Sequence, residues 1–160
     1  MTEPAPTAEP AWLTESEQRA WRAWRRMFPL VNARIARDLG QDSALSEADY
    51  DVLSVLSESP GHRRRVSDLA ERMLWSRSRL SHQITRMELR GLVRREEVAC
   101  DGRGAEVRLT ETGLETITEA APPHVASVRR HLIDLLTPAQ MEALTQLGDA
   151  ITERLAEEGP

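Results

Sequence analysis

The sequence predicts a mainly α-helical protein that carries one small β-hairpin. Apolar residues recur every three or four positions through most of the chain, which is the period of a helix with one buried face. Between residues 92 and 109 the period falls to two, around a turn that contains Gly102 and Gly104. This pattern is typical of two antiparallel strands joined by a tight connection. The length of 160 residues favours one domain, or one domain with appended helices.

Composition excludes several classes of protein. Cys100 is the only cysteine, so an internal disulfide is impossible. No stretch approaches the roughly 18 apolar residues of a membrane-spanning helix. The first eleven residues have neither the basic nor the apolar region of a secretory signal. We therefore expect residues 1–12 to be a disordered leader on a soluble cytoplasmic protein, with no membrane partner.

The first predicted helix follows Thr14-Glu15-Ser16-Glu17. This is a capping box, in which a hydroxyl and a carboxylate each satisfy the other residue's backbone amide. Pro29 lies inside the helix and predicts a kink near residues 25–27. The apolar spacing predicts a buried stripe formed by Trp21, Trp24, Phe28, Val31, Ile35 and Leu39.

Two short helices are predicted before residue 75. Leu45-Ser46-Glu47-Ala48-Asp49 has the cap and acidic first turn of a helix start, and Ser59-Pro60-Gly61 ends that helix. Ser67 is predicted to cap the next one. The intervening His62-Arg63-Arg64-Arg65 has two interpretations: a contact with a phosphate backbone, or a disordered basic loop.

A longer helix is predicted to follow the turn at Leu74-Trp75. Ser76 is its expected N-cap, and the helix runs to Arg90. Gly91 then takes the left-handed position just beyond the end. Side chains at i, i+4 and i+7 share one side of a helix, so the predicted buried face consists of Leu80, Ile84 and Met87.

The remaining predicted elements are a hairpin and two helices. Residues 92–98 and 106–109 are the expected strands. Thr110 is predicted to cap the next helix, which we expect Pro122-Pro123 to break or bend. A last helix follows a second capping box, Thr137-Pro138-Ala139-Gln140.

Two helices, a short turn between them and a hairpin directly afterwards describe a winged helix-turn-helix. We place this module at residues 45–110. The helical segments on either side, 13–44 and 111–158, are longer than such a small module requires. Their apolar stripes need a partner, and a second copy of the chain is the natural candidate. We therefore interpret them as N- and C-terminal dimerisation helices.

Charge is distributed unevenly along the chain. The net charge of −5 by itself argues against a nucleic-acid ligand. However, residues 61–108 contain 12 arginines and 7 acids, whereas the rest of the chain contains 9 arginines and 19 acids. A basic middle between acidic flanks indicates a segment that faces a polyanion. The alternative is an ordinary solvated face.

The predicted helix from Ser76 carries the pattern that favours nucleic acid. No acid occurs between residues 75 and 87. Short hydroxyl side chains allow close approach to the major groove, and arginine can donate two hydrogen bonds to guanine. The predicted DNA-binding residues are Ser76, Arg77, Ser78, Arg79, Ser81, His82 and Arg86.

The hairpin tip adds a second candidate contact. Arg103 lies between two glycines, so no bulky neighbour prevents it from entering a narrow minor groove, where the negative potential is enhanced. Asp101 is positioned to brace its guanidinium group. The alternative is a surface arginine in a flexible turn.

The sequence Asp101-Gly102-Arg103-Gly104-Ala105-Glu106-Val107-Arg108-Leu109-Thr110-Glu111-Thr112-Gly113 resembles the wing signature D-x-R-x5-L-T-x2-G of the MarR family of winged-helix transcription factors. Residues 67–72 and 86–95 match the same family in type and order, and the resemblance extends from about residue 45 to residue 113. It implies a homodimer whose terminal helices interlock. It also implies recognition helices in successive major grooves of a pseudo-palindromic DNA operator, with wings in the flanking minor grooves. Most such relatives repress transcription and release DNA when a small, often phenolic, ligand or an oxidant reaches them.

The signal to which the protein responds is left open by the sequence. Trp12, Trp21, Trp24, Tyr50 and Trp75 are candidates to line an effector pocket between the DNA-binding and dimer regions, or else they pack in the core. A regulator of the same fold that responds to oxidation at Cys100, or to a metal at His124, His131 and Asp134, is the alternative. A winged helix that binds a protein instead of DNA is a further alternative. We expect no enzyme activity and no cofactor, because no glycine-rich phosphate loop or nucleophile–base pair is visible.

Overall fold

The structure is a computed structural model of the chain, and it describes residues 11–97 and 105–157. The expected order of helices and strands is confirmed, with one strand added. The elements are α1 (Glu15–Ser43), α2 (Glu47–Ser57), η1 (Pro60–His62), β1 (Arg63–Arg65), α3 (Val66–Arg72), α4 (Arg77–Leu89), β2 (Val93–Glu97), β3 (Ala105–Leu109), α5 (Glu111–His131), η2 (Ile133–Leu135) and α6 (Pro138–Glu157).

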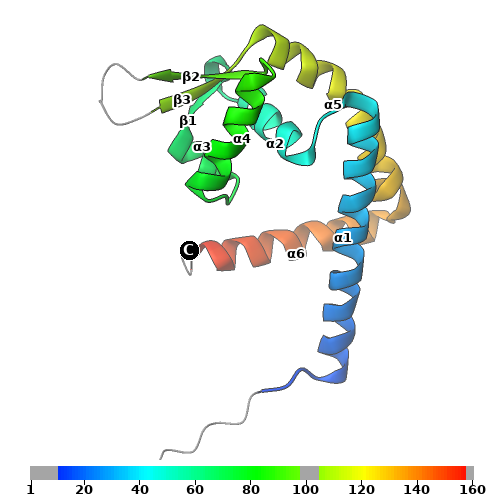
Figure 1. Cartoon of the computed structure of the whole chain (residues 1–160). Helices are drawn as coiled ribbons and strands as arrows, with labels where there is room; N and C mark the ends of the chain where they lie inside the picture. The colour runs from blue at the N-terminus through cyan, green and yellow to red at the C-terminus, as the bar shows by residue number, and fades with distance from the viewer. Residues whose placement is uncertain (1–10, 98–104, 158–160) are drawn as a thin grey trace, which may run out of the picture.

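The elements separate into a rounded part and long helices that leave it. Figure 1 shows α2, α3, α4 and the sheet gathered together; we call the described residues 45–97 and 105–110 the winged lobe. α5 leads from the sheet to the flank of α1, against which it packs. The N-terminal half of α1 extends away from the lobe, and α6 runs from the α1–α5 side beneath the lobe in Figure 1; we call these two segments the projecting helices. The described helices include none that is long and apolar enough to cross a membrane.

The winged lobe has a closed apolar core. α4 contributes the face predicted from its spacing, since Leu80, Ile84 and Met87 are completely buried. They pack with side chains from α2, α3 and the strands. The other fully buried members are Val52, Leu53, Leu56, Leu69 and Val107. The helical period of α4 therefore aligns one face with the core and leaves the opposite face to solvent.

The sheet has three antiparallel strands in the order β1-β3-β2. The predicted hairpin is confirmed as β2 and β3. The third strand is a correction, because residues 63–65, expected as a phosphate contact or a disordered loop, pair with β3 as a short edge strand. Three consecutive arginines show no alternation of apolar and polar residues, so the sequence pattern does not predict a strand here. The strand forms because the edge of β3 offers backbone groups with which it can pair.

Most helix starts are confirmed. The capping boxes at Thr14 and Ser46 are both complete, and Ser76 and Thr110 each accept a hydrogen bond from a backbone amide three residues later. The cap predicted at Ser67 is wrong. α3 begins at Val66 with Arg65 in the capping position, and the Ser67 hydroxyl donates to Asp68 Oδ1 at 2.9 Å. The β1–β3 pairing brings the chain directly into the helix and shifts its start.

The prolines lie inside helices that continue past them. α5 continues through Pro122 and Pro123, so the helix is not broken there. α1 likewise continues through Pro29. A proline removes one helical hydrogen bond and disturbs its preceding turn, but α5 is packed against both α1 and α2. The packing of α5 against α1 and α2 thus stabilises a helix that the two prolines by themselves would tend to end.

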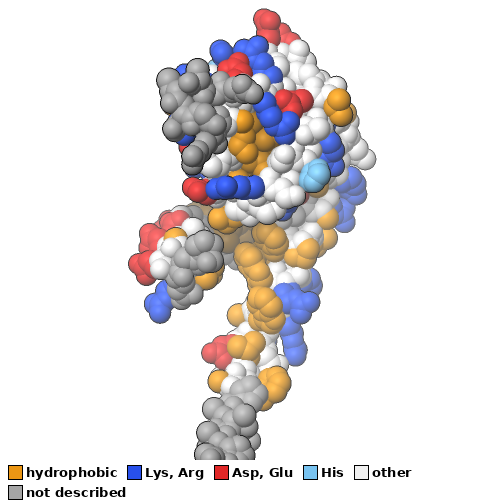
Figure 2. Space-filling view, turned by 60° about the vertical axis from the view of Figure 1, so that its left-hand side comes forward, with side chains coloured by type: hydrophobic (Ala, Val, Ile, Leu, Met, Phe, Trp, Pro, Cys, Tyr) orange, Lys and Arg blue, Asp and Glu red, His pale blue; other side chains and the backbone are white. Residues whose placement is uncertain are grey.

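The stripe predicted on α1 is only partly buried in the single chain. Leu39 is 3% exposed, but Trp21 is 51%, Trp24 48% and Phe28 50% exposed. The prediction that all of them are buried is therefore wrong for one chain by itself. Within α6, which is wholly contained in the described part of the chain, no residue is buried. Figure 2 shows hydrophobic side chains continuing along α1 below the winged lobe.

Candidate nucleic-acid interface

The outward face of α4 assembles most of the predicted DNA-binding residues. Ser76 accepts a hydrogen bond from the Arg79 amide at 3.2 Å, which starts the helix and exposes its first turn. The inner residues are locked in the core, so the outer ones cannot rotate inward. All of the predicted residues on this helix are exposed, namely Ser76, Arg77, Ser78, Arg79, Ser81, His82 and Arg86.

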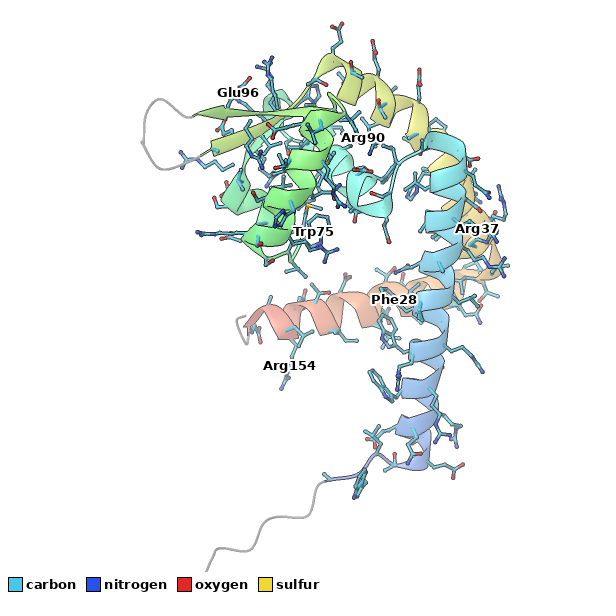
Figure 3. All side chains as sticks on the ribbon, viewed as in Figure 1. Phe28, Arg37, Trp75, Arg90, Glu96 and Arg154 are labelled. Carbon is cyan, nitrogen blue, oxygen red and sulfur yellow. The ribbon has the colours of Figure 1, made fainter. Side chains whose placement is uncertain are left out.

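Arg79 also stabilises the turn that precedes α4. Its guanidinium carbon lies 4.1 Å from the centroid of the Trp75 ring, which is a close cation–π contact. Trp75, labelled in Figure 3, is half-buried against the core cluster. Arg79 thereby presents its charge beside the first turn of α4, with its side chain supported on an aromatic surface.

Arg95 fastens the wing strand β2 to α4, a role that no local pattern around it predicts. Its guanidinium donates to the Ser81 carbonyl at 2.9 Å and to the Thr85 hydroxyl at 3.1 Å, and it pairs with Glu88. Its backbone amide also donates to Glu88 Oε1 at 2.8 Å. The position of the wing relative to α4 is therefore set by a polar clamp as well as by the core.

A buried polar network connects α4 to the start of α2. Asp49 accepts hydrogen bonds from Ser46, from Gln83 Nε2 at 2.7 Å and from Arg90 Nη1 at 2.8 Å. Burial by itself would raise the pKa of Asp49, but the hydrogen bonds from Ser46 and Arg90 outweigh it, so the pKa lies below its ordinary value. Arg90, labelled in Figure 3, also donates to the carbonyl of Ala44, beyond the end of α1.

Gln83 is a residue of this network that the sequence interpretation overlooked. It is 2% exposed, and its Oε1 accepts a hydrogen bond from Arg86 Nη2. The signal was present: Gln83 is a polar residue between the apolar positions Leu80 and Ile84 of the buried stripe. A buried amide requires partners, so a polar residue at that position predicts a specific bonded neighbour.

The outer face of the sheet is also rich in arginine. Register places Arg63 and Arg94 directly opposite Arg108. Glu96 and Glu106 reduce their mutual repulsion, since Glu96 lies 2.7 Å from Arg94 and Glu106 lies 3.8 Å from Arg63. Exposed pairs of this kind stabilise a fold by at most about 1 kcal/mol. They therefore offset the charge of neighbouring arginines on the sheet more than they stabilise it.

The wing tip lies outside the described residues. This applies to Asp101 and Arg103, the predicted minor-groove contacts, and to Cys100, the predicted site of oxidation. The strands that lead into the tip and out of it are described, and they end at Glu97 and begin again at Ala105.

The five aromatic residues proposed for an effector pocket do not share one cavity. Tyr50 and Trp75 line one cavity of about 230 Å³ between α2 and the α3–α4 turn, together with Asp51, Ser54, Val55, Arg72 and Met73. Burial raises the pKa of Asp51, and nearby Glu47 adds to this effect. Trp21 lines a different cavity of about 310 Å³ with Trp12, near the start of α1. Trp24 stacks on Phe28 with ring centroids 5.1 Å apart.

The residues considered for a metal site do not converge. His131 Nε2 lies 2.8 Å from Asp38 Oδ2, whereas Asp134 accepts a hydrogen bond from Arg129 at 2.6 Å. His124 stacks on Tyr50 with ring centroids 4.0 Å apart. No three potential ligands in the described part of the chain lie close enough to hold a metal ion. Metal sensing at His124, His131 and Asp134 is therefore not supported.

His131 instead belongs to the joint between α1 and α5. Asp38 is 7% exposed and accepts a hydrogen bond from the Ser127 hydroxyl at 2.9 Å in addition to its contact with His131. The contact with His131, and after it the bond from Ser127, hold the pKa of Asp38 below its ordinary value. Arg130 adds a longer interaction at 3.3 Å. The Asp38 carboxylate of α1 is thus linked to α5 by the side chains of Ser127, Arg130 and His131.

Comparison with known proteins agrees with this architecture. Residues 45–104 match the sequence model of the MarR family. The chain is 33% identical over 129 residues to the transcriptional regulator HosA of Escherichia coli O157:H7, an alignment that covers 81% of this chain and 91% of HosA.

Two solved structures are similar over nearly the whole chain. AbsC, a MarR family transcriptional regulator from Streptomyces coelicolor, is 49% identical with a TM-score of 0.88 and covers 92% of this chain and 99% of its own. Sco3205, a MarR family regulator from the same organism that was solved in complex with DNA, is 38% identical with a TM-score of 0.88 and covers 93% of each chain. These relatives are transcriptional regulators and not enzymes. The chain belongs to the MarR family of transcriptional regulators.

Proposed function

We propose that this regulator is a homodimeric repressor. It binds a pseudo-palindromic operator in double-stranded DNA through α4 and the wing at residues 98–106, and a small-molecule effector releases it. A repressor of this kind blocks transcription by occupying the operator, so deletion of its gene is expected to raise expression from the promoter to which it binds.

One observation carries the DNA-binding part of the proposal. The outward face of α4 exposes arginines, hydroxyls and a histidine, while the acids of the neighbouring network point elsewhere, with Asp49 buried beneath the helix. Hydroxyls permit close approach and arginines bind guanine edges and phosphates. A relative of 38% identity was solved with DNA, which supports the same ligand for this chain.

DNA binding is testable before the operator sequence has been identified. A DNA duplex selected by the protein from a randomised pool would be titrated by fluorescence anisotropy at several salt concentrations. We expect steep salt dependence, because bound arginines displace counterions from phosphates. Changing Arg77 and Arg86 together to alanine should weaken binding by about tenfold or more and reduce the salt slope.

The matched control removes two arginines far from α4. Arg19 and Arg129 have side chains that are 66% and 60% exposed, and their double alanine variant has the same net charge as the α4 variant. It should bind the selected duplex within about twofold of the unaltered protein. Binding that ignores salt, or that survives loss of Arg77 and Arg86, would show that the outward face of α4 does not bind the DNA. Failure to select any duplex would instead favour a winged helix that recognises a protein.

The projecting helices support the homodimer. On α1 the exposed apolar residues are Trp21, Trp24, Met27, Phe28 and Leu30, and on α6 they are Leu147, Ile151 and Leu155. Soluble monomers rarely leave contiguous apolar surface of this extent uncovered. Two chains related by a twofold axis would bury the projecting helices of one chain against those of the other. The same symmetry would place the two α4 helices on one side of the assembly.

The cavity beside Tyr50 and Trp75 is the proposed effector site. It is bounded by an aromatic ring on each of two elements, by the Arg72 side chain, and by Asp51. Aromatic walls with a cation on one side and a carboxylate on the other suit a small phenol that also carries a carboxylate, because Arg72 can pair with the ligand carboxylate while Asp51 accepts a hydrogen bond from the phenolic hydroxyl. The cavity adjoins the α3–α4 turn that Arg79 and Trp75 stabilise, so a bound molecule would alter the support of α4.

Salicylate, a phenolic carboxylate, serves as the first probe of this site. We expect it to quench tryptophan fluorescence and to weaken binding to the selected duplex. Arg72→Gln should reduce both effects at least about fivefold, because the charge-assisted hydrogen bond to the carboxylate is lost. Arg22→Gln at the other cavity is the control, and if it reduces the response equally the assignment to Tyr50 and Trp75 is wrong.

A further inference from the structure

Gln83 is the only amide side chain within the buried stripe of α4, and it is bonded at both ends. Its side chain is 2% exposed between the core residues Leu80 and Ile84. Burial of an amide is unfavourable unless its donor and acceptor are both satisfied. Here Nε2 donates to Asp49 Oδ1 at 2.7 Å, and Oε1 accepts from Arg86 Nη2.

The chemistry of Asp49 decides which way this amide points. An ionised carboxylate can only accept hydrogen bonds. The NH2 group of Gln83 must therefore face Asp49, and its carbonyl must face the outside of α4. Asp49 is itself held at the start of α2 by the Ser46 amide at 2.9 Å and by Arg90 at 2.8 Å. A chain of oriented bonds thus runs from α2 through the core to the exposed side chain of Arg86.

Arg86 is the final member of this chain and lies on the proposed DNA-binding face. Its guanidinium has five donors, and the bond to Gln83 uses one of them. The rest of the planar group is left for a ligand while its direction is restrained. Attraction to phosphate depends on charge, whereas discrimination between bases depends on the direction of paired donors. A restraint on Arg86 therefore acts on sequence discrimination more than on general attraction to DNA.

We propose that Gln83 is a positioning residue that orients Arg86 for recognition of DNA sequence. This inference rests on the proposed DNA-binding function of α4. Gln83 is buried and cannot touch DNA, but according to this proposal it influences which DNA sequence the protein prefers.

The test compares a selected duplex with a scrambled duplex of equal length and composition. Gln83→Met keeps the length of the side chain and removes both hydrogen bonds. We expect binding to the selected duplex to weaken about tenfold, binding to the scrambled duplex to stay within twofold, and the salt slope to remain unchanged. Arg86→Ala should weaken binding to the selected duplex as well, and adding Gln83→Met to it should cause no further loss.

A reciprocal exchange provides the rescue. The double variant Asp49→Asn with Gln83→Glu keeps the net charge, and it lets an amide at 49 donate to a carboxylate at 83, which again accepts from Arg86. We expect this variant to discriminate between the two duplexes within about threefold of the unaltered protein. Thermal denaturation checks that each variant is folded. If Gln83→Met does not fold, Gln83→Asn tests the same restraint, because its shorter side chain cannot reach both partners.

Several results would overturn the inference. These are an unchanged preference in the Gln83 variant, an equal loss on both duplexes, a further loss in the Arg86→Ala background, or no recovery in the exchanged variant. In each case the unaltered protein still selects a duplex, so the proposed function stands. If the unaltered protein selects no duplex, the proposed function fails and the inference fails with it.

Discussion

The winged lobe and the projecting helices use apolar side chains in opposite ways. In the lobe, Leu53, Leu69 and Leu80 are completely buried by neighbours from the same chain. In the projecting helices, Trp24 and Ile151 are about half exposed although they lie on apolar stripes of similar spacing. The same helical pattern therefore forms a closed core where other elements pack against it. Where fewer of the described residues pack against it, the apolar side chains stay partly exposed. The lobe is therefore covered by its own chain, whereas the apolar stripes of the projecting helices stay about half exposed, which is where we propose that a second chain packs.

Loss of a core side chain in the lobe should cause the largest decrease in the free energy of unfolding. Leu80→Ala removes a fully buried side chain of α4, and we expect the free energy of unfolding to fall by about 2–5 kcal/mol. Urea denaturation at one protein concentration measures it. Leu89→Ala on the same helix is the control, because Leu89 is 85% exposed and its loss should cost less than about 0.5 kcal/mol. Similar losses for both would mean that the lobe core is not closed as described.

A charge on α6 should separate the two copies and leave the lobe intact. Leu147 is 61% exposed in the single chain. Leu147→Arg would place an unpaired cation in the proposed dimer interface and raise the dimer dissociation constant by about 100-fold. Sedimentation equilibrium measures this, and circular dichroism should show an unchanged helix content of the whole chain. Gln146→Arg adds the same charge on the polar side of the helix. If both variants stay dimeric, α6 is not in the interface.

The buried network of the lobe should give a pH-dependent effect of intermediate size. The folded pKa of Asp49 lies below its ordinary value of 3.8. Its contribution to stability is therefore present above about pH 4 and is lost as the pH falls through the folded pKa. Asp49→Asn should lower the free energy of unfolding by about 1–3 kcal/mol at pH 7, and the difference should shrink towards pH 3.

An exposed ion pair on a projecting helix should matter least. Glu15 and Arg19 lie one turn apart at 2.8 Å, with side chains 91% and 66% exposed. Solvent screens such a pair, so Glu15→Ala should change the free energy of unfolding by less than about 0.5 kcal/mol. Thermal denaturation at low and high salt measures it. A larger effect would show that the start of α1 is more enclosed in the proposed dimer than in the single chain.

Much of the site was predictable because it depends on local rules. Ser76 and Thr110 cap their helices as expected, and Leu80, Ile84 and Met87 lie where the period of α4 places them. Capping and periodicity involve residues only three or four positions apart. They are therefore readable before any tertiary contact is known.

The unpredicted features all depend on contacts between distant segments. β1 exists because β3 offers an edge, and Arg95 has its role because β2 lies along α4. The role of Gln83 depends on its hydrogen bond to Asp49, which is 34 residues away in the sequence. No local pattern specifies such pairings, since the partner is brought near only when the chain folds.

The sequence by itself determined the order of the helices, the buried and exposed sides of α4, and the concentration of arginine around the wing. Those properties follow from residue type and short spacing. Only the tertiary structure decided that the described residues leave the aromatic side chains of α1 about half exposed, that Tyr50 and Trp75 share a cavity from which Trp21 is absent, and that Arg86 is tied to a buried carboxylate through Gln83. The physical reason is that burial and hydrogen-bond partnership are properties of assembled surfaces, and the same apolar stripe becomes core or interface according to what packs against it.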